Sequence, residues 1–231
     1  MDNAMTNVIR FPLPPEKQYD SERAKVIRPY LEYLYAHFAL NGTRYVWYDG
    51  EHPITKKLQF IGADASLMCK HMLALRYIDE KTDFHRPVNF CLEVVSNSTT
   101  APQIPGWMRI RSDGLNVDRL VYCYIWIEDI LDVFVINFPQ LQEWFWHDKN
   151  YLKFGREHIM QGTPNKTISR LIPVTIVAKN VLMNRYLIMR NGTMLQVNGL
   201  ASQDPVDAAK RLLRVKGMPF KVIGRREGTI A

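Results

Sequence analysis

The sequence predicts a protein of the α/β class, because segments with helical periodicity alternate with runs of residues that favour strands. Leu31, Leu34 and Tyr35 recur at the three- and four-residue spacing of a buried helix face. The runs 88–96 and 120–127 are rich in β-branched and aromatic residues, as buried strands are. Helices and strands are therefore expected to pack together in one core.

Taken in order, the elements suggest three regions. Residues 1–18 hold three prolines and little periodicity, so we expect an extended arm, followed by a core over 19–155. The elements expected in that core are a helix from Asp20 or Ser21 to about Leu40, a strand at 44–48, a hairpin of 58–69 with 74–82, strands at 88–96, 120–127 and 130–138, and a helix at 141–152.

Residues 156–231 are expected to form a β-rich C-terminal extension packed on the core and ending in a basic helix. Its expected strands are 171–179 and 186–189. The final helix has Asp204 as its N-cap, Pro205 at its first position and Gly217 past its end.

The residues with the clearest chemistry lie in the expected hairpin. Asp64 follows Gly62-Ala63, and Asp79 is the only acidic residue of the chain with a lysine, Lys81, two positions later. Two carboxylates can hold Mg²⁺ through oxygen ligands and leave positions for water and phosphate. A neighbouring lysine can orient or activate the attacking water, or neutralise developing charge.

The geometry of a hairpin brings these groups together. Asp79 and Lys81 would project from one face of a strand, and Glu80 from the other. If the chain reverses around His71-Met72, Asp64 lies opposite Asp79, with Cβ atoms about 5 Å apart. The turn itself lacks Gly, Pro, Asn and Asp, so turn chemistry does not predict this hairpin.

The pattern Asp64…Asp79-x-Lys81 resembles the PD-(D/E)xK superfamily of restriction-endonuclease-like nucleases, including uncharacterised bacterial and phage members. The resemblance extends over roughly residues 20–150, through Gln59 and the segments 89–93, 105–107 and 118–126. It implies a central mixed β-sheet flanked by helices and Mg²⁺-dependent cleavage of nucleic acid, with Mn²⁺ as a substitute. One departure is that Ala63 stands where the family name has proline.

Three further residues are candidates for accessory roles. Glu93 could replace Asp79 as the second acid of the motif, but Val94-Val95 supplies no lysine, so it reads as an accessory acid or a structural carboxylate. A helix before the motif contributes an acid in many members of the superfamily, and Glu32 is the candidate, although an exposed glutamate is the more common role. Gln59 is the third candidate.

The charge distribution favours nucleic acid as the partner. The net charge is +7, and residues 205–231 hold seven Lys and Arg against two acids. Such a basic end is expected for contacts with phosphates, although a solvated helix face would look the same. The candidate contacts are the basic residues Lys210, Arg211 and Arg214 of the final helix, and Arg109 and Arg111, which would share one face of an extended segment.

The composition indicates where in the cell the protein is expected. No apolar run approaches the length of a membrane span and no signal peptide is recognisable, so we expect a cytoplasmic protein without a membrane partner. The three cysteines lack metal-binding spacing.

The sequence therefore predicts a Mg²⁺-dependent DNA endonuclease, restriction-type or carried by a phage or mobile element. Cutting both strands with one site per chain favours a homodimer. The alternatives are a nucleic-acid-binding protein that no longer cuts and an anti-restriction accessory protein. DNA against RNA, and endo- against exonuclease action, stay open.

Overall fold

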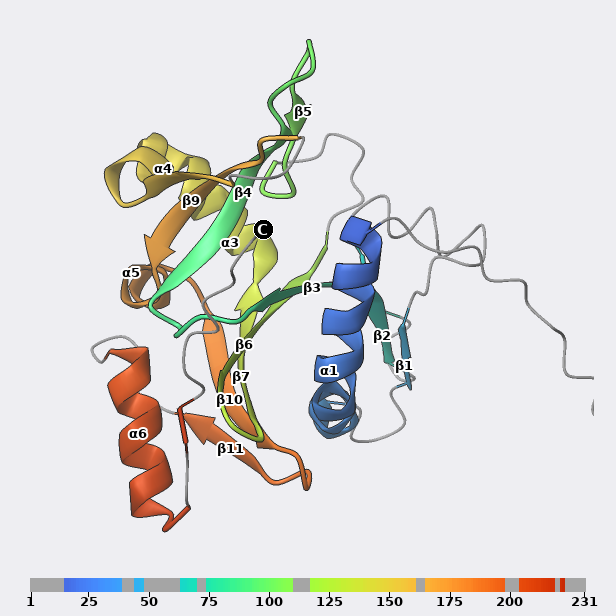
Figure 1. The fold of residues 1–231 in the computed structure, drawn as a ribbon, viewed down its shortest axis with the longest axis vertical. Coiled ribbons are helices and arrows are strands. Elements are labelled where there is room, and N and C mark those ends of the chain that lie inside the picture. Colours follow the sequence, from blue (N-terminus) through green and yellow to red (C-terminus); the bar gives the residue numbers. More distant parts are fainter. Residues whose placement is uncertain are drawn as a thin grey trace, which may run out of the picture.

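The computed structural model describes residues 15–38, 44–47, 63–69, 74–109, 117–160, 165–197, 204–218 and 221–222. They form a mixed α/β fold built on two β-sheets (Figure 1). The main sheet has seven strands in the order β1 (Arg44–Trp47), β2 (Ala65–Cys69), β3 (Ala74–Asp83), β6 (Arg119–Ile127), β7 (Ile130–Asn137), β10 (Met183–Met189) and β11 (Met194–Val197). Neighbours pair antiparallel except β3 and β6, which are parallel, so the expectation of a mixed sheet is confirmed.

The second sheet has four antiparallel strands in the order β5 (Ile104–Pro105), β4 (Asn89–Asn97), β9 (Ile168–Pro173) and β8 (Arg156–Ile159). Two of these strands, β4 and β5, belong to the connection between the parallel strands β3 and β6. The connection thus leaves the main sheet, contributes to the second sheet and returns.

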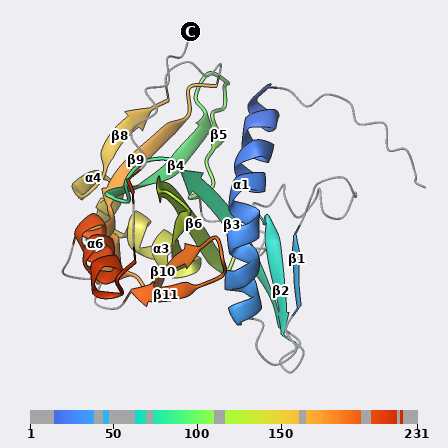
Figure 2. The ribbon, with the colours of Figure 1, turned by 60° about the horizontal axis from the view of Figure 1, so that its bottom comes forward.

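The helices occupy both faces of the main sheet (Figures 1 and 2). Helix α1 (Pro15–Phe38) lies on one face, where Leu31, Leu34 and Tyr35 are fully buried. The second sheet and helices α3 (Phe138–Trp146), α5 (Val174–Asn180) and α6 (Pro205–Val215) lie on the other. A short 3₁₀ turn, η1 (His147–Lys149), and α4 (Asn150–Lys153) follow α3.

Alternation along the strands produces two hydrophobic cores. On β6, Val121 and Cys123 face α1, whereas Leu120, Tyr122 and Tyr124 face the second sheet and the other helices. The central strands are therefore buried on both sides. This explains why their sequences read as nearly continuous apolar runs.

A buried ion pair links three central strands of the main sheet. Arg185 of β10 donates from Nε to Asp132 Oδ1 at 2.7 Å and from Nη2 to Oδ2 at 2.5 Å. Trp126 Nε1 donates to the same carboxylate at 2.8 Å. Both charged side chains are 0 % exposed. Removing either partner would leave a buried, uncompensated charge.

The C-terminal third of the chain differs from the expected extension. Strands β8 and β9 complete the second sheet, and β10 and β11 complete the main sheet, so residues beyond 155 are integral to both. The final helix is as predicted: Asp204 accepts hydrogen bonds from Val206 N and Asp207 N, and Gly217 has a φ of +64° after its end.

Three other boundaries differ from expectation. Helix α1 begins at Pro15, so the last four residues of the expected arm 1–18 are helical, and residues 1–14 lie outside the described residues. The expected strand 171–179 ends at Pro173 and continues as α5, which buries Val174 and Val177 at helical spacing. The expected helix 141–152 is interrupted at Asp148 and Lys149, where φ is positive.

No helix among the described residues is both long and apolar enough to cross a membrane.

Candidate active site

The hairpin that carries the motif forms with the predicted register. Strands β2 and β3 pair antiparallel, and the last pair before Asp64 is Ala65 with Ile78. Asp64 N, just beyond the last of these pairs, donates to Ile78 O at 2.8 Å. Residues 58–62 and 70–73 of the expected hairpin lie outside the described part of the chain.

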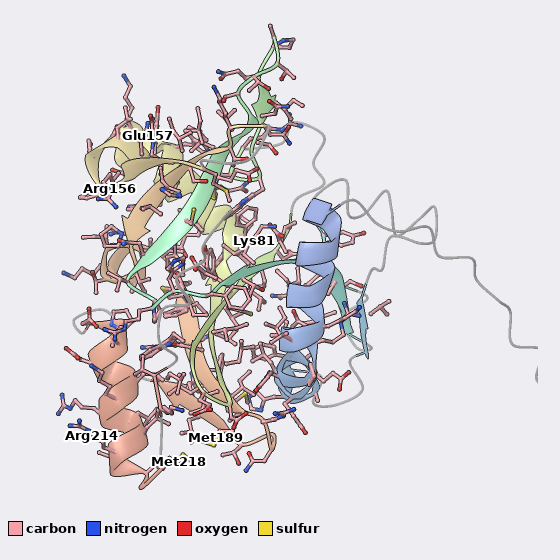
Figure 3. The ribbon with its side chains drawn as sticks, in the orientation of Figure 1. Lys81, Arg156, Glu157, Met189, Arg214 and Met218 are labelled. Atoms are coloured by element: carbon pink, nitrogen blue, oxygen red, sulfur yellow. The ribbon has the colours of Figure 1, made fainter. Side chains whose placement is uncertain are left out.

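Alternation along β3 separates its charged residues as predicted. Asp79 and Lys81, the latter labelled in Figure 3, lie on the same face of β3. Lys81 Nζ donates to Asp79 Oδ1 at 2.6 Å. Glu80 lies on the opposite face, where it accepts a hydrogen bond from Tyr35 of α1. Its backbone N donates to Asp64 Oδ2 at 2.8 Å, so the main chain of β3 orients the Asp64 carboxylate.

The Asp79 carboxyl is almost completely withdrawn from solvent, with 1 % of the residue exposed. Burial raises its pKa well above the usual range, and the nearby Asp64 charge and a hydrogen bond with Asp64 raise it further, against the opposing effect of Lys81. The buried carboxylate therefore gains from any additional positive charge placed beside it.

Lys81 remains protonated at this position. Burial alone would lower the pKa of its ammonium, but the charges of Asp79 and Asp64, the hydrogen bond to Asp79 and the charge of Glu93 raise it above the usual lysine value. The ammonium also lies 5.4 Å from the centroid of the Trp107 ring, within the range of a cation–π contact. A lysine held in this form can stabilise negative charge but cannot accept a proton.

Glu93 of β4 brings a third carboxylate to the site from the second sheet. Burial raises its pKa, while Lys81, Ser96 and the Trp107 backbone N–H counteract that rise. These are the effects of a partly buried carboxyl close to the ammonium. Both roles left open for Glu93, an accessory acid and a structural carboxylate, are consistent with this location.

The segment after β5 is held tightly against β4 and presents Trp107. Met108 N donates to Glu93 O at 3.1 Å, and Gly106 N donates to Val94 O at 2.8 Å. A Cβ on Gly106 would come within 2.5 Å of Glu93 O, so only glycine permits this approach. Sequence reasoning assigned no role to Trp107, and the glycine before it was the available signal.

The charges of the site do not balance. The charges of Asp64, Asp79 and Glu93 all act on the ammonium of Lys81, so these four groups, when fully ionised, carry two excess negative charges. A divalent cation would neutralise them, and carboxylate oxygens are its preferred ligands. Among the described residues no three His, Cys, Asp or Glu side chains could hold a metal by themselves. The described residues thus offer two neighbouring carboxylates, Asp64 and Asp79, as possible ligands of a cation, and not a complete set.

The other predicted site residues lie elsewhere. Glu32 is exposed on α1 and does not take part in the contacts described above. Arg109 is exposed in a turn closed by its N–H to Gly106 O at 3.2 Å, rather than in an extended segment. Gln59 and Arg111 lie outside the described residues.

The predicted basic contacts on α6 form a separate surface. Arg211 and Arg214 are exposed, whereas Lys210 is half-buried one turn after Val206, at the flank of the buried face. Figure 3 shows Arg214 on α6, well away from Lys81 on β3. The structure therefore does not bring the basic helix to the carboxylates.

No family model matches the chain, and no curated protein or solved structure shows significant similarity to it.

Proposed function

We propose that this protein is a Mg²⁺-dependent nuclease of the PD-(D/E)xK type that hydrolyses phosphodiester bonds of DNA as an endonuclease, restriction-type or encoded by a phage or mobile element. One observation supports the proposal above all: the Lys81 ammonium is bonded to Asp79 and lies within electrostatic reach of Asp64 and Glu93, and the backbone N of Glu80 orients the Asp64 carboxylate. This arrangement is short of two positive charges, which matches a hard divalent cation.

The residues would divide the work as follows. Asp64 and Asp79 hold the cation, which when bound polarises the scissile phosphate and lowers the pKa of an attacking water. Lys81, fixed by Asp79 and Trp107, stabilises the charge that develops on the phosphate. Glu93, whose pKa is raised by burial, is suited to accept the proton of the water.

The step is a hydrolysis at phosphorus. The water oxygen would form a bond to phosphorus while its proton passes to Glu93, and the bond to one ester oxygen would break. That oxygen would take a proton from solvent water and leave as a hydroxyl. The products are a terminal phosphate and a terminal hydroxyl. Mn²⁺ can replace Mg²⁺, since it accepts the same oxygen ligands. Two such chains, related by two-fold symmetry, would cut both strands of a duplex, so the proposal includes a homodimer.

Supercoiled and linear duplex DNA, incubated with the purified protein in Mg²⁺ or in EDTA, test this proposal. We expect Mg²⁺-dependent nicking or linearisation of the circle. Asp79→Asn should slow cleavage roughly 100-fold or more, because it removes a charged ligand of the cation. The matched control is Asp83→Asn on the same strand, whose carboxylate caps His85 N at 2.9 Å and should be dispensable.

Cleavage that persists in EDTA or in Asp79→Asn would contradict the proposed mechanism. DNA binding without cleavage in either Mg²⁺ or Mn²⁺ would favour the non-catalytic alternative.

A further inference from the structure

A tyrosine on α1 makes a buried contact with the back of the motif strand. Tyr35 is 0 % exposed, and its hydroxyl donates to Glu80 Oε1 at 2.5 Å. Burial raises the pKa of Tyr35 well above its usual value, and the Glu80 charge adds to this. The hydroxyl therefore keeps its proton and remains the donor.

Glu80 takes part in hydrogen bonds through both its side chain and its backbone. Its carboxylate meets Tyr35 on the α1 side, while its backbone N donates to Asp64 Oδ2 at 2.8 Å. Asp64 N is itself bonded to Ile78 O at 2.8 Å. The direction of the Asp64 carboxylate thus depends on the exact path of β3 at Glu80.

Helix α1 is a firm support for that path. Its residues Ile27, Leu31 and Leu34 are buried in the core between the helix and the main sheet, at 2 % exposure or less. Tyr35 extends this face and reaches the strand at the residue that holds Asp64. No other contact described for α1 leads so directly to the site.

We infer that Tyr35 is a positioning residue for the cation: through Glu80 it fixes β3, and through the Glu80 N–H it fixes the Asp64 carboxylate. This inference rests on the proposed function. Metal ligands must be held to within about 0.5 Å of the productive geometry. Losing a hydrogen bond behind a ligand commonly weakens metal affinity about 10- to 100-fold. The contribution of α1 to the site is then a hydroxyl, in place of the expected acid Glu32.

The test measures the affinity of the full-length protein for Mn²⁺ by isothermal titration calorimetry, without DNA. Tyr35→Phe should weaken binding about 10-fold or more, because it keeps the ring and removes only the donor. Glu80→Gln alone, with Tyr35 intact, should keep near-normal affinity, since an amide oxygen accepts the same bond and the backbone N–H is unchanged. Tyr33→Phe, a half-exposed position of the same helix, is the matched control and should leave affinity unchanged.

A second variant tests the inference in case Tyr35→Phe alone fails to fold. In the double substitution Tyr35→Phe with Glu80→Leu both polar partners are replaced by apolar groups, which is often nearly neutral for stability. It should fold, as checked by its thermal unfolding, and still bind Mn²⁺ weakly. A merely structural tyrosine would alter the unfolding temperature and leave the affinity of the folded protein unchanged.

The two possible failures are distinguishable. If wild-type protein binds Mn²⁺ and the folded Tyr35→Phe or double variant binds it equally well, the positioning role is wrong and the proposed nuclease stands. If wild-type protein binds no Mn²⁺, the proposed function is wrong, and the inference with it.

Discussion

At the residue scale, the site is defined by where charge is buried. Asp79 is buried on β3, and the ammonium of Lys81 lies 2.6 Å from its carboxylate. The charges of Asp64 and Glu93 act on the same ammonium. Such an excess of buried negative charge is costly for the folded state. A bound cation would offset this cost, and without a cation the folded state would be less stable.

Stability in EDTA should reveal this cost. The pKa of Asp79 is raised in the folded state, so the folded protein holds the proton more tightly than the unfolded chain. The stabilising contribution of the protonated group is present below the unfolded pKa, near 4, and is lost as the pH rises through the folded value. Asp79→Asn should therefore unfold at a higher temperature than wild type at neutral pH, and at the same temperature in acid.

Differential scanning calorimetry from pH 3 to pH 8 measures this difference. Each kcal/mol gained at neutral pH corresponds to an increase of roughly 2–4 °C for a chain of this size. An Asp79→Asn protein that is less stable than wild type at neutral pH would show that the ion pair with Lys81 outweighs the burial of the charge.

At the element scale, the hairpin illustrates what local sequence can determine. Asp79 and Lys81 share a face because side chains alternate along any strand, whatever its distant contacts. The register of β2 and β3 follows from matching their apolar faces. The end of the final helix was predictable for the same reason: Asp204, Pro205 and Gly217 act within one turn of the backbone.

Elements whose identity depends on distant contacts were not predictable. Residues 174–180 are rich in β-branched residues, yet Val174 and Val177 are buried together on a helix that packs against the aromatic core. Burial by tertiary contacts outweighs local strand propensity. Tyr35 has no local signature, and the glycine before Trp107 signals only a close backbone approach, since the partners Glu80 and Lys81 are 45 and 26 residues away.

Helix α6 should contribute affinity for DNA and not the chemical step, because its basic face is remote from Lys81. Replacing Lys210, Arg211 and Arg214 by glutamine should weaken binding and leave the rate constant of cleavage at saturation unchanged. If all three residues contact phosphates, the slope of log affinity against log salt should fall by roughly 2.7.

Fluorescence anisotropy with labelled duplex DNA over a range of salt concentrations measures this slope. The control changes the net charge equally at other exposed positions: Lys153→Gln, Arg156→Gln and Lys179→Gln. An unchanged slope in the α6 variant, or an equal fall in the control, would show that α6 is only a solvated surface.

At the scale of the whole molecule, the predicted boundary at residue 155 divides both sheets. Strand β4, which carries Glu93, pairs with β9, and β7 pairs with β10. Such pairings between distant segments leave no trace in local composition, which explains why the C-terminal strands were expected to form an extension. The basic character of the last helix was evident from the sequence, but its distance from the site was not.

A chain ending at residue 155 should therefore fail to fold. It would lack the partners of β4 and β7 and would leave Asp132 buried without Arg185, at a cost of about 3–5 kcal/mol. Far-UV circular dichroism should show no cooperative thermal transition, and co-expression with residues 156–231 should restore one. A cooperative transition in the fragment alone would show that the first 155 residues are an independent domain.

The connection between β3 and β6 has an evolutionary consequence. Parallel neighbours require a long crossover, and here the crossover also supplies Glu93 and Trp107. Its tip at Thr99–Gln103, between β4 and β5, is exposed. Insertions at such a tip are tolerated because they alter neither the strand pairing nor the core. Related chains could therefore diversify what they recognise by lengthening this tip, while the carboxylates and the lysine stay in place.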